Sequence, residues 1–285
     1  MPKQILVTGA NGQLGQSVKE ISAHYPQLAF TFVSRTELNI TNQAEITAYF
    51  KANSFDAVIN CAAYTAVDLA ESDVDNARLV NATATHYLAE ATAAQGIPFI
   101  HISTDYVFDG TVSTPRLETD QVNPIGVYGQ TKLEGEELAL VINPKTIIIR
   151  TAWVYSKYAK NFVKTMLWLF KEKEEIGVID DQIGSPTNAV DLADAIAQIL
   201  SKEELVYGIF NYSNEGECSW FEFASKIKEI SNSTIKIKPI PTTAYPTQAK
   251  RPAYSLLDKT KIKEAYQINI PNWEESLKKE LTTLL

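Results

Sequence analysis

The segment TGANGQLG, residues 8–15, constrains the fold of this chain more than any other. A short apolar run precedes it, and an amphipathic helical pattern follows. Its glycines are Gly9, Gly12 and Gly15. Glycines here let the backbone turn tightly and approach a pyrophosphate, while the helix N-terminus offers free N–H groups and a partial positive charge. An ordinary tight turn would also use glycine, but the strand–loop–helix context favours a dinucleotide site.

The first half of the chain alternates short apolar runs with longer helical patterns. Strands are predicted at 4–9, 28–34, 55–63, 98–104 and 145–153, and helices at 14–25, 42–53, 74–96 and 129–141. Strands that are apolar throughout and alternate with helices are typical of a parallel sheet covered on both faces. We therefore expect an α/β fold, a doubly wound Rossmann-like sheet whose ligand crevice lies at the carboxyl ends of the strands.

The second half of the chain is less regular. Its patterns predict helices at 161–175, 187–200, 219–231 and 272–285, a strand at 208–213, and a turn-rich segment with four prolines at 238–255. A segment of this last kind inside a globular chain is often an irregular binding loop. We expect an NAD(P)-binding domain and a smaller C-terminal substrate-binding lobe. The first would comprise residues 1–155 and 186–215, and the second residues 156–185 and 216–285.

Composition and charge exclude several classes of function. The formal net charge of −8 argues against nucleic-acid binding, which needs surfaces rich in Lys and Arg. No stretch is apolar enough to cross a membrane, and the N-terminal segment lacks a signal-peptide pattern. Cys61 and Cys218 are far apart and show no metal-ligand spacing. These features predict a cytoplasmic protein with reduced thiols.

The end of the second predicted strand, VSRTELN, bears on the choice of cofactor. An acidic residue there would bind a ribose 2′-hydroxyl and favour NAD. This chain instead has Ser34 and Arg35, whose hydroxyl and guanidinium suit a 2′-phosphate. The sequence therefore predicts NADPH. NADH stays as the alternative, because Glu37 lies close enough to oppose a phosphate.

Tyr128 and Lys132, in YGQTK, form a candidate acid–base pair. At i and i+4 they share one face of a helix, and a nearby ammonium lowers the pKa of a phenol. Such a phenol can pass a proton to a carbonyl oxygen as a hydride reaches its carbon. The spacing alone is common by chance, and a solvated helix start would also produce it.

A second polar cluster, Ser103-Thr104-Asp105, follows the strand predicted at 98–104. Its hydroxyls emerge at the carboxyl edge of the sheet, where one of them can hydrogen-bond a substrate carbonyl beside the tyrosine. A polar strand end can also simply satisfy its own turn. A glycine loop, a strand-end hydroxyl and a later Tyr/Lys pair, in that order, are nevertheless far more specific together than singly.

These motifs resemble the extended short-chain dehydrogenase/reductases, and within them the dTDP-4-dehydrorhamnose reductases. The resemblance spans nearly the whole chain, through TGANGQLG, CAAYTAVDLAE, STDYVFDG, PIGVYGQTKLEGE, IIRTAWVY, NFVKTM, DQIGSPT and AYPTQAKRPAYSLLD. It implies reduction of the C4 keto group of dTDP-4-dehydro-6-deoxy-L-mannose to dTDP-L-rhamnose with NAD(P)H, for cell-surface polysaccharide synthesis. It also implies a dTDP-sugar as substrate and a homodimer as the assembly.

Matched motif by motif, the resemblance implies roles for individual residues. Tyr128 would donate the proton with Lys132 as its partner, Thr104 would bond the keto oxygen, and Asp105 would contact the sugar. Cofactor contacts would come from Gly9, Asn11, Gly12, Gln13, Leu14, Gly15, Ser34, Arg35, Asn39, Ile40, Ala62, Ala63, Tyr64, Tyr128 and Lys132. Substrate contacts would come from Thr65, Val67, Thr104, Asp105, Trp153, Asn161 and Arg251, although a core position is an equal alternative for Trp153.

The chain departs from the family pattern at two places. Asn39 stands where the family often has an aspartate, so it cannot accept as a carboxylate there. Some relatives have acidic residues proposed to bind magnesium at a dimer interface. The matching stretches here, GQSV and NAV, carry no carboxylates, so we expect no metal site.

Three rival functions remain open on the sequence. A sugar-nucleotide 4,6-dehydratase needs a glutamate after Thr104-Asp105, where this chain has Tyr106. A 4-epimerase would consume no net cofactor. A non-catalytic NADP-binding regulatory subunit, like the beta subunit of methionine adenosyltransferase, would bind a partner protein without turnover; the presence of Thr104, Tyr128 and Lys132 argues against it.

Overall fold

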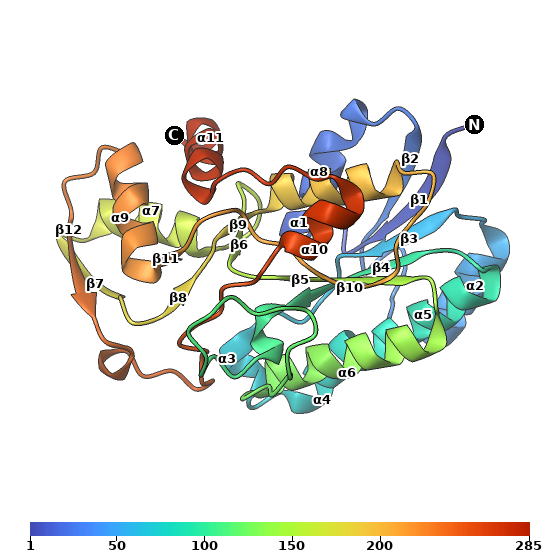
Figure 1. Ribbon diagram of the computed structural model, residues 1–285, viewed down its shortest axis with the longest axis horizontal. Helices are drawn as coiled ribbons and strands as arrows, with labels where there is room; N and C mark the ends of the chain where they lie inside the picture. The colour runs from blue at the N-terminus through green and yellow to red at the C-terminus, as the bar shows by residue number, and fades with distance from the viewer.

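A six-stranded, fully parallel sheet forms the centre of the larger part of the molecule. The computed structural model describes residues 1–285. Strand order across the sheet is β10-β5-β4-β3-β1-β2. Figure 1 labels the strands of this sheet. The strands are β1 (Lys3–Thr8), β2 (Leu28–Val33), β3 (Ala57–Asn60), β4 (Phe99–Thr104), β5 (Thr146–Thr151) and β10 (Gly208–Asn211). The doubly wound, Rossmann-like parallel sheet predicted from the sequence is confirmed.

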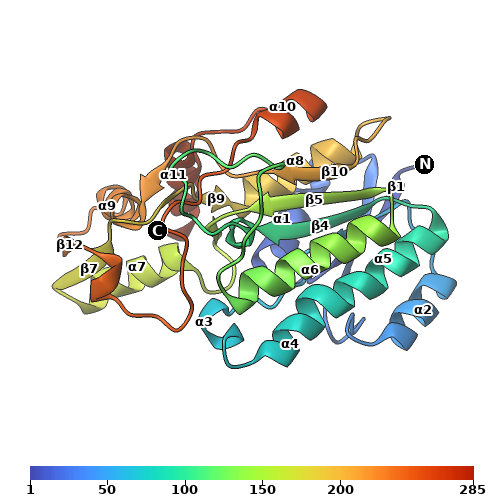
Figure 2. The same ribbon diagram turned by 60° about the horizontal axis from the view of Figure 1, so that its bottom comes forward.

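Helices cover both faces of this sheet because the strands are apolar on both. Ile147 and Ile149 of β5 enter one core, while Ile148 between them enters the other. The first core includes side chains of α1 (Gln13–Ile21), α8 (Ala189–Leu200) and α10 (Thr260–Tyr266). The second includes side chains of α2 (Gln43–Ala52), α5 (Ala84–Gln95) and α6 (Val127–Ile142), which lie side by side in Figure 2.

The helix predicted at 74–96 is interrupted by a π-helical turn. It consists of α4 (Val74–Arg78), a π-helical segment at Leu79–Thr83, and α5. Asn81 in this turn bonds both the backbone N–H and the carbonyl of Tyr64, at 2.8 and 3.2 Å. Gly135 of α6 lies so near that a Cβ there would meet the Asn81 carbonyl oxygen. The π turn thus joins α6 to the segment that follows β3.

A separate apolar core holds the smaller lobe together. It draws on α7 (Phe162–Glu172), β7 (Glu175–Ile179), α9 (Trp220–Ile230) and α11 (Trp273–Leu284). Strand β12 (Lys236–Ile240) pairs with β7 in parallel. Two short ladders connect the surrounding loops: β6 (Val154–Tyr155) with β9 (Thr187–Asn188), and β8 (Ile183–Gly184) with β11 (Cys218–Ser219). Figure 1 shows α7, α9, β7 and β12 at the end of the molecule away from β1 and β2.

Some element predictions for this half of the chain need correction. The helix predicted at 161–175 ends at Glu172, and β7 begins at Glu175. The turn-rich segment 238–255 begins inside β12. Neither strand was predicted, because both are short and half exposed. The helices α3 (Val67–Ala70) and α10 were also missed, since short helices carry little periodic signal. No helix reaches the length and apolarity needed to span a bilayer.

A buried ion pair fixes α6 against the sheet. The carboxylate of Glu136 accepts from Arg150 of β5, with an Nη2–Oε2 distance of 2.7 Å and an Nε–Oε1 distance of 3.0 Å. Ser103 of β4 donates its hydroxyl to the same carboxylate. Both charged side chains are at most 2% exposed. Tyr128, Lys132 and Glu136 recur every four residues, so the contact also sets which face of α6 is turned inward.

Removing this carboxylate should destabilise the fold strongly. Glu136→Ala is expected to lower the free energy of unfolding by about 3–5 kcal/mol, because the Arg150 guanidinium would stay buried without its partner. Urea denaturation followed by circular dichroism measures the loss.

The matched control lies two residues earlier on the same helix. Glu134 pairs with Arg78 at 3.0 Å, but both side chains are well exposed. Glu134→Ala should therefore cost no more than about 1 kcal/mol. Similar losses for the two variants would show that the Glu136 pair does not hold the helix.

Candidate active site

The glycine loop brings the ends of β1 and β3 into contact. Gly9 has a φ of +68°, and a Cβ there would lie 2.6 Å from the amide nitrogen of Ala62. Gly12 is the N-cap of α1, which leaves the first amides of that helix free of side-chain caps. In the sheet, β1 lies between β3 and β2, so the chain crosses to opposite sides here. This is the switch point where doubly wound sheets bind nucleotides.

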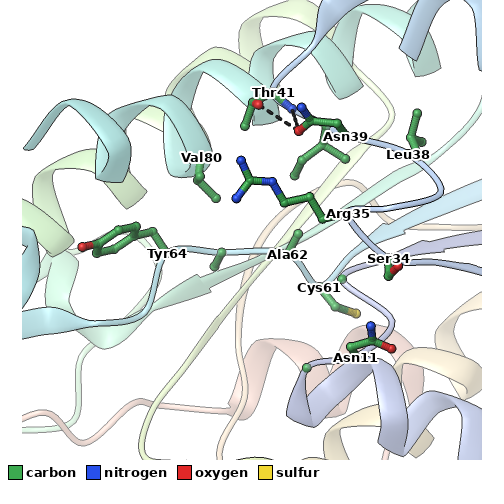
Figure 3. Close-up of a pocket in the computed structure, with 14 residues that line it drawn as sticks. Asn11, Ser34, Arg35, Leu38, Asn39, Thr41, Cys61, Ala62, Tyr64 and Val80 are labelled. Carbon is green, nitrogen blue, oxygen red and sulfur yellow. Dashed lines mark hydrogen bonds between the residues drawn. The ribbon is translucent and has the colours of Figure 1, made fainter. Parts of the chain in front are cut away.

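A cavity of about 440 Å³ opens over this loop. Figure 3 shows the Arg35 side chain extending across it toward Val80. Its lining residues are Gly9, Asn11, Gly12, Ser34, Arg35, Leu38, Asn39, Ile40, Thr41, Cys61, Ala62, Ala63, Tyr64 and Val80.

Most of the residues predicted for the cofactor line this cavity, and five of them do not. Leu14 is buried in the sheet core, and a Cβ at Gly15 would clash with the Gly9 carbonyl. Gln13 turns toward the lobe, where its side-chain oxygen accepts from Ser156 and Asn161. Tyr128 and Lys132 also lie outside the lining.

The sequence reasoning missed four lining residues: Leu38, Thr41, Cys61 and Val80. Leu38, Thr41 and Cys61 are chain neighbours of predicted residues, so widening the motifs would have found them. Val80 comes from the π-helical turn, and no sequence signal places it there.

A carboxylate already occupies Ser34, one of the two residues expected to bind a 2′-phosphate. Glu37 accepts from both the backbone N–H and the hydroxyl of Ser34, each at 2.6 Å. These hydrogen bonds hold the pKa of Glu37 below its usual value. Arg35, by contrast, makes no ion pair and reaches into the cavity. The side-chain oxygen of Asn39 accepts a hydrogen bond from the Thr41 hydroxyl at 2.9 Å, which stabilises the turn that follows β2.

Thr104 and Tyr128 meet at the carboxyl end of β4. Thr104 is the last residue of that strand, and Tyr128 lies in the first turn of α6. Burial raises the pKa of Tyr128 to about 12, although a hydrogen bond with the Thr104 side chain lowers it. The phenol is therefore protonated at neutral pH, as a proton donor must be.

Lys132 points into the protein one helical turn from Tyr128. Its side-chain nitrogen, Nζ, is 2.6 Å from the Ile102 carbonyl oxygen and 3.0 Å from His101 Nε2. The side chain is 1% exposed, and this burial lowers the pKa of Lys132 to about 8. His101 was not predicted as a site residue; its position within β4, between apolar neighbours, gave no functional signal.

Asp105 presents an unused acceptor beside the tyrosine. It is 2% exposed, and its Oδ1 accepts from Thr104 at 2.9 Å. Its Oδ2 is buried without a hydrogen-bond partner. Burial raises the pKa of Asp105 to about 6. A buried carboxylate oxygen without a partner is uncommon in folded proteins, which marks Asp105 as a candidate functional residue.

A second cavity, of about 420 Å³, lies in the smaller lobe. Arg251 lines it and also forms a two-point ion pair with Asp68 of α3, with an Nη2–Oδ2 distance of 2.8 Å. The full lining is Phe162, Thr165, Met166, Leu169, Ile176, Gly177, Val178, Ile179, Gln182, Trp220, Tyr245, Thr247 and Arg251.

The other residues predicted for the substrate line neither of the two cavities. Trp153, with a φ of +47°, stacks on Trp220 at a ring-centroid distance of 3.6 Å. Asn161 caps α7 and donates to Gln13 and to the Ser156 carbonyl, so its side chain is already occupied. Thr65 is exposed, and Val67 begins α3. No three His, Cys, Asp or Glu side chains are grouped to hold a metal ion.

Fold and site together define the class of this protein. A parallel sheet with a glycine loop at its switch point, and a Tyr-x-x-x-Lys helix beside a strand-end threonine, are the features of a short-chain dehydrogenase/reductase. The family model described as "RmlD substrate binding domain" matches residues 3–285, and the chain belongs to this family, the dTDP-4-dehydrorhamnose reductases.

Named relatives agree over the full length of the chain. The dTDP-4-dehydrorhamnose reductase of Aggregatibacter actinomycetemcomitans is 42% identical, over 96% of this chain and 97% of the relative. A crystal structure of the Clostridium acetobutylicum reductase is 40% identical with a TM-score of 0.94, covering 99% of both chains. The Bacillus anthracis reductase in complex with NADP is 37% identical with a TM-score of 0.95, covering 99% of this chain and 100% of that chain.

Because the backbone of Gly9 lies against that of Ala62, a side chain at position 9 should destabilise the fold. Gly9→Ala is expected to lower the free energy of unfolding for two reasons: the left-handed backbone and the overlap with Ala62. Gly96 caps α5 with almost the same φ, +66°, but nothing lies within 4 Å of its Cβ position.

Gly96→Ala should therefore lower the free energy of unfolding only through the left-handed backbone conformation, without any overlap of atoms. We expect Gly9→Ala to cost about 1–3 kcal/mol more than Gly96→Ala in urea denaturation, the penalty of overpacking a tight contact. Equal costs would mean that the β1 and β3 ends can move apart.

Proposed function

We propose that this protein reduces the C4 keto group of dTDP-4-dehydro-6-deoxy-L-mannose to dTDP-L-rhamnose with NADPH. One observation carries the proposal: Tyr128 and Lys132 of α6 lie against the carboxyl end of β4, where Thr104 neighbours Tyr128 and Lys132 bonds the Ile102 carbonyl. The family to which the chain belongs, and the relatives named as dTDP-4-dehydrorhamnose reductases, support the same reaction.

The cofactor would lie over the glycine loop. Its diphosphate would face the free amides of α1, beside Asn11 and Gly12. Arg35 would bind a 2′-phosphate, and Ser34 would also bind it after the Glu37 carboxylate releases the Ser34 hydroxyl. The Bacillus anthracis relative is in complex with NADP, which supports NADPH here. NADH stays an alternative cofactor, because the Glu37 carboxylate opposes a phosphate and could instead accept from a 2′-hydroxyl.

The residues at the end of β4 can carry out a carbonyl reduction. When bound, a reduced nicotinamide would supply a hydride to C4, and the electron pair of the C=O double bond would move onto the oxygen. Thr104 would turn its hydroxyl from Asp105 to donate a hydrogen bond to that oxygen, and Tyr128 would give it a proton. The resulting phenolate is stabilised by the nearby Lys132 ammonium and regains a proton from solvent.

The sugar nucleotide would lie between the two parts of the chain. The apolar wall of the lobe cavity, with Phe162 and Trp220, suits a base, and Arg251 suits a diphosphate. Asp105 Oδ2 would accept from a sugar hydroxyl, and Trp153 would pack against the ring. Under this proposal Asn161 acts through the α7 cap rather than by touching substrate.

The proposed roles divide the chain in two. Residues 1–155 and 186–215 would bind cofactor, and 156–185 and 216–285 would bind substrate. We also propose a homodimer and a cytoplasmic location, on the family resemblance. Tyr106 takes the place of a second catalytic carboxylate and packs edge-on to Tyr128, with ring centroids 5.5 Å apart. This favours a reductase over a 4,6-dehydratase.

Tyr128→Phe tests the proton donor directly. In an NADPH-oxidation assay with the 4-keto-6-deoxy sugar nucleotide, the wild type should turn over, and the variant should lose at least ~100-fold in kcat. Tyr106→Phe is the matched control, because it also removes one phenol from the same aromatic pair; its kcat should change little. Full activity in Tyr128→Phe would refute the assigned role, and no turnover by the wild type would favour a regulatory subunit.

Arg35 and Glu37 should shift cofactor preference in opposite directions. Arg35→Ala removes the cation in the cavity and should lower kcat/KM for NADPH more than for NADH. Glu37→Gln removes the opposing carboxylate and should raise the NADPH-to-NADH ratio of kcat/KM roughly fivefold, as expected for one exposed charge. A change in the same direction in both variants would contradict this assignment of the 2′-phosphate site.

A further inference from the structure

A line of buried hydrogen bonds runs across three strands to Lys132. Thr8 of β1, Asn60 of β3 and His101 of β4 are register partners in the sheet. The Thr8 hydroxyl donates to Asn60 Oδ1 at 2.7 Å, Asn60 Nδ2 lies 3.0 Å from His101 Nδ1, and His101 Nε2 lies 3.0 Å from Lys132 Nζ. All four side chains are at most 1% exposed.

The orientation of the Asn60 amide is fixed by a group that can only donate. The backbone N–H of Ala62 donates to Asn60 Oδ1 at 3.2 Å, and the Thr8 hydroxyl donates to the same atom. The oxygen therefore faces these donors, and the amide NH₂ faces His101.

This orientation determines the tautomer of His101. Because Asn60 donates, Nδ1 of the ring must accept, and the single proton of a neutral imidazole is then on Nε2. Burial holds the pKa of His101 well below its usual value, and any charge on Lys132 lowers it further, so the ring is neutral. The Nε2–H group thus points at the Lys132 nitrogen.

An ammonium group has no lone pair to accept this hydrogen, whereas a neutral amine has one. We propose that His101 is a positioning residue for Lys132: its Nε2–H, oriented by Asn60, donates to the Lys132 amine and disfavours the ammonium form. Lys132 meanwhile donates to the Ile102 carbonyl.

The other charged groups near Lys132 do not remove this effect. Glu136, one turn further along α6, raises the pKa of Lys132, but its carboxylate is held by Arg150 of β5. Tyr128, one turn earlier, is protonated at neutral pH, and Asp105 at the end of β4 faces Thr104. Burial works in the same direction as the imidazole N–H.

The consequence for turnover rests on the proposed reduction. The Lys132 ammonium stabilises the Tyr128 phenolate, so the active form lies below the pKa of Lys132. Activity should therefore fall as the pH rises through about 8. The tautomer of His101 is independent of any turnover and can be measured without substrate.

The first experiment measures the tautomer by ¹⁵N NMR of the histidine rings in the full-length protein. The chain has three histidines, so His24→Gln and His86→Gln assign the remaining signals. We expect His101 to show a protonated Nε2 and an unprotonated Nδ1, without titrating between pH 6 and 9. A protonated Nδ1 in the wild type would overturn the proposal, whether or not the protein is a reductase.

The second experiment reverses the tautomer with Asn60→Asp. The carboxylate keeps the acceptor for Thr8 and Ala62 and accepts from His101 Nδ1, so Nε2 would accept from Lys132. NMR should show the proton on Nδ1. The alkaline limb of kcat should move up by about one pH unit or more, because the ammonium is then favoured.

His101→Gln separates the tautomer from the added charge of the aspartate. A neutral glutamine can turn its carbonyl to Lys132, so it too should move the alkaline limb upward while KM for the sugar nucleotide stays the same. A shift in Asn60→Asp with none in His101→Gln would mean that charge alone acts, and it would overturn the role of His101. If neither variant folds, the wild-type tautomer decides the proposal.

Discussion

The contact between α6 and the strands β4 and β5 is the constraint on which the site depends. Glu136 is held by Arg150 and Ser103 in a buried, two-point ion pair. A buried charge without its partner is strongly destabilising, so the helix has little freedom to rotate. Since side chains four residues apart share a helix face, fixing Glu136 also fixes Lys132 and Tyr128. The phenol is thereby delivered to the end of β4, beside Thr104.

The sheet supplies the second half of the arrangement. Parallel strands bring their carboxyl ends to one edge, so the glycine loop after β1, the segment after β3 and the Thr104–Asp105 pair after β4 become neighbours. Next to this edge, register places Thr8 and Asn60, the last residues of β1 and β3, side by side with His101 of β4. Through Lys132, the edge of the sheet is connected to the buried hydrogen bonds among Thr8, Asn60 and His101. Polar side chains can be buried there because each of them has a hydrogen-bond partner.

Local patterns allowed much of the architecture to be predicted. The apolar strands, the glycine loop and the Tyr/Lys spacing each follow from short-range physics, and the sheet they predict is confirmed. Prediction was wrong where elements are short or half exposed: β7 and β12 were missed, and the predicted helix at 161–175 overran its end. Side-chain roles were harder still. The prediction that Asn161 contacts substrate stays untested; the sequence did not show that its side chain caps α7.

The sequence by itself determined the fold class, the nucleotide loop and the spacing of Tyr128 and Lys132, because each depends on residues near one another in the chain. Only the tertiary structure decided what surrounds them. Val80 reaches the cavity through a π-helical turn, and Asn60 dictates the proton on His101. Both depend on contacts between segments that are distant in the chain. A hydrogen bond is decided by which donor meets which acceptor, and the order of residues alone does not contain that.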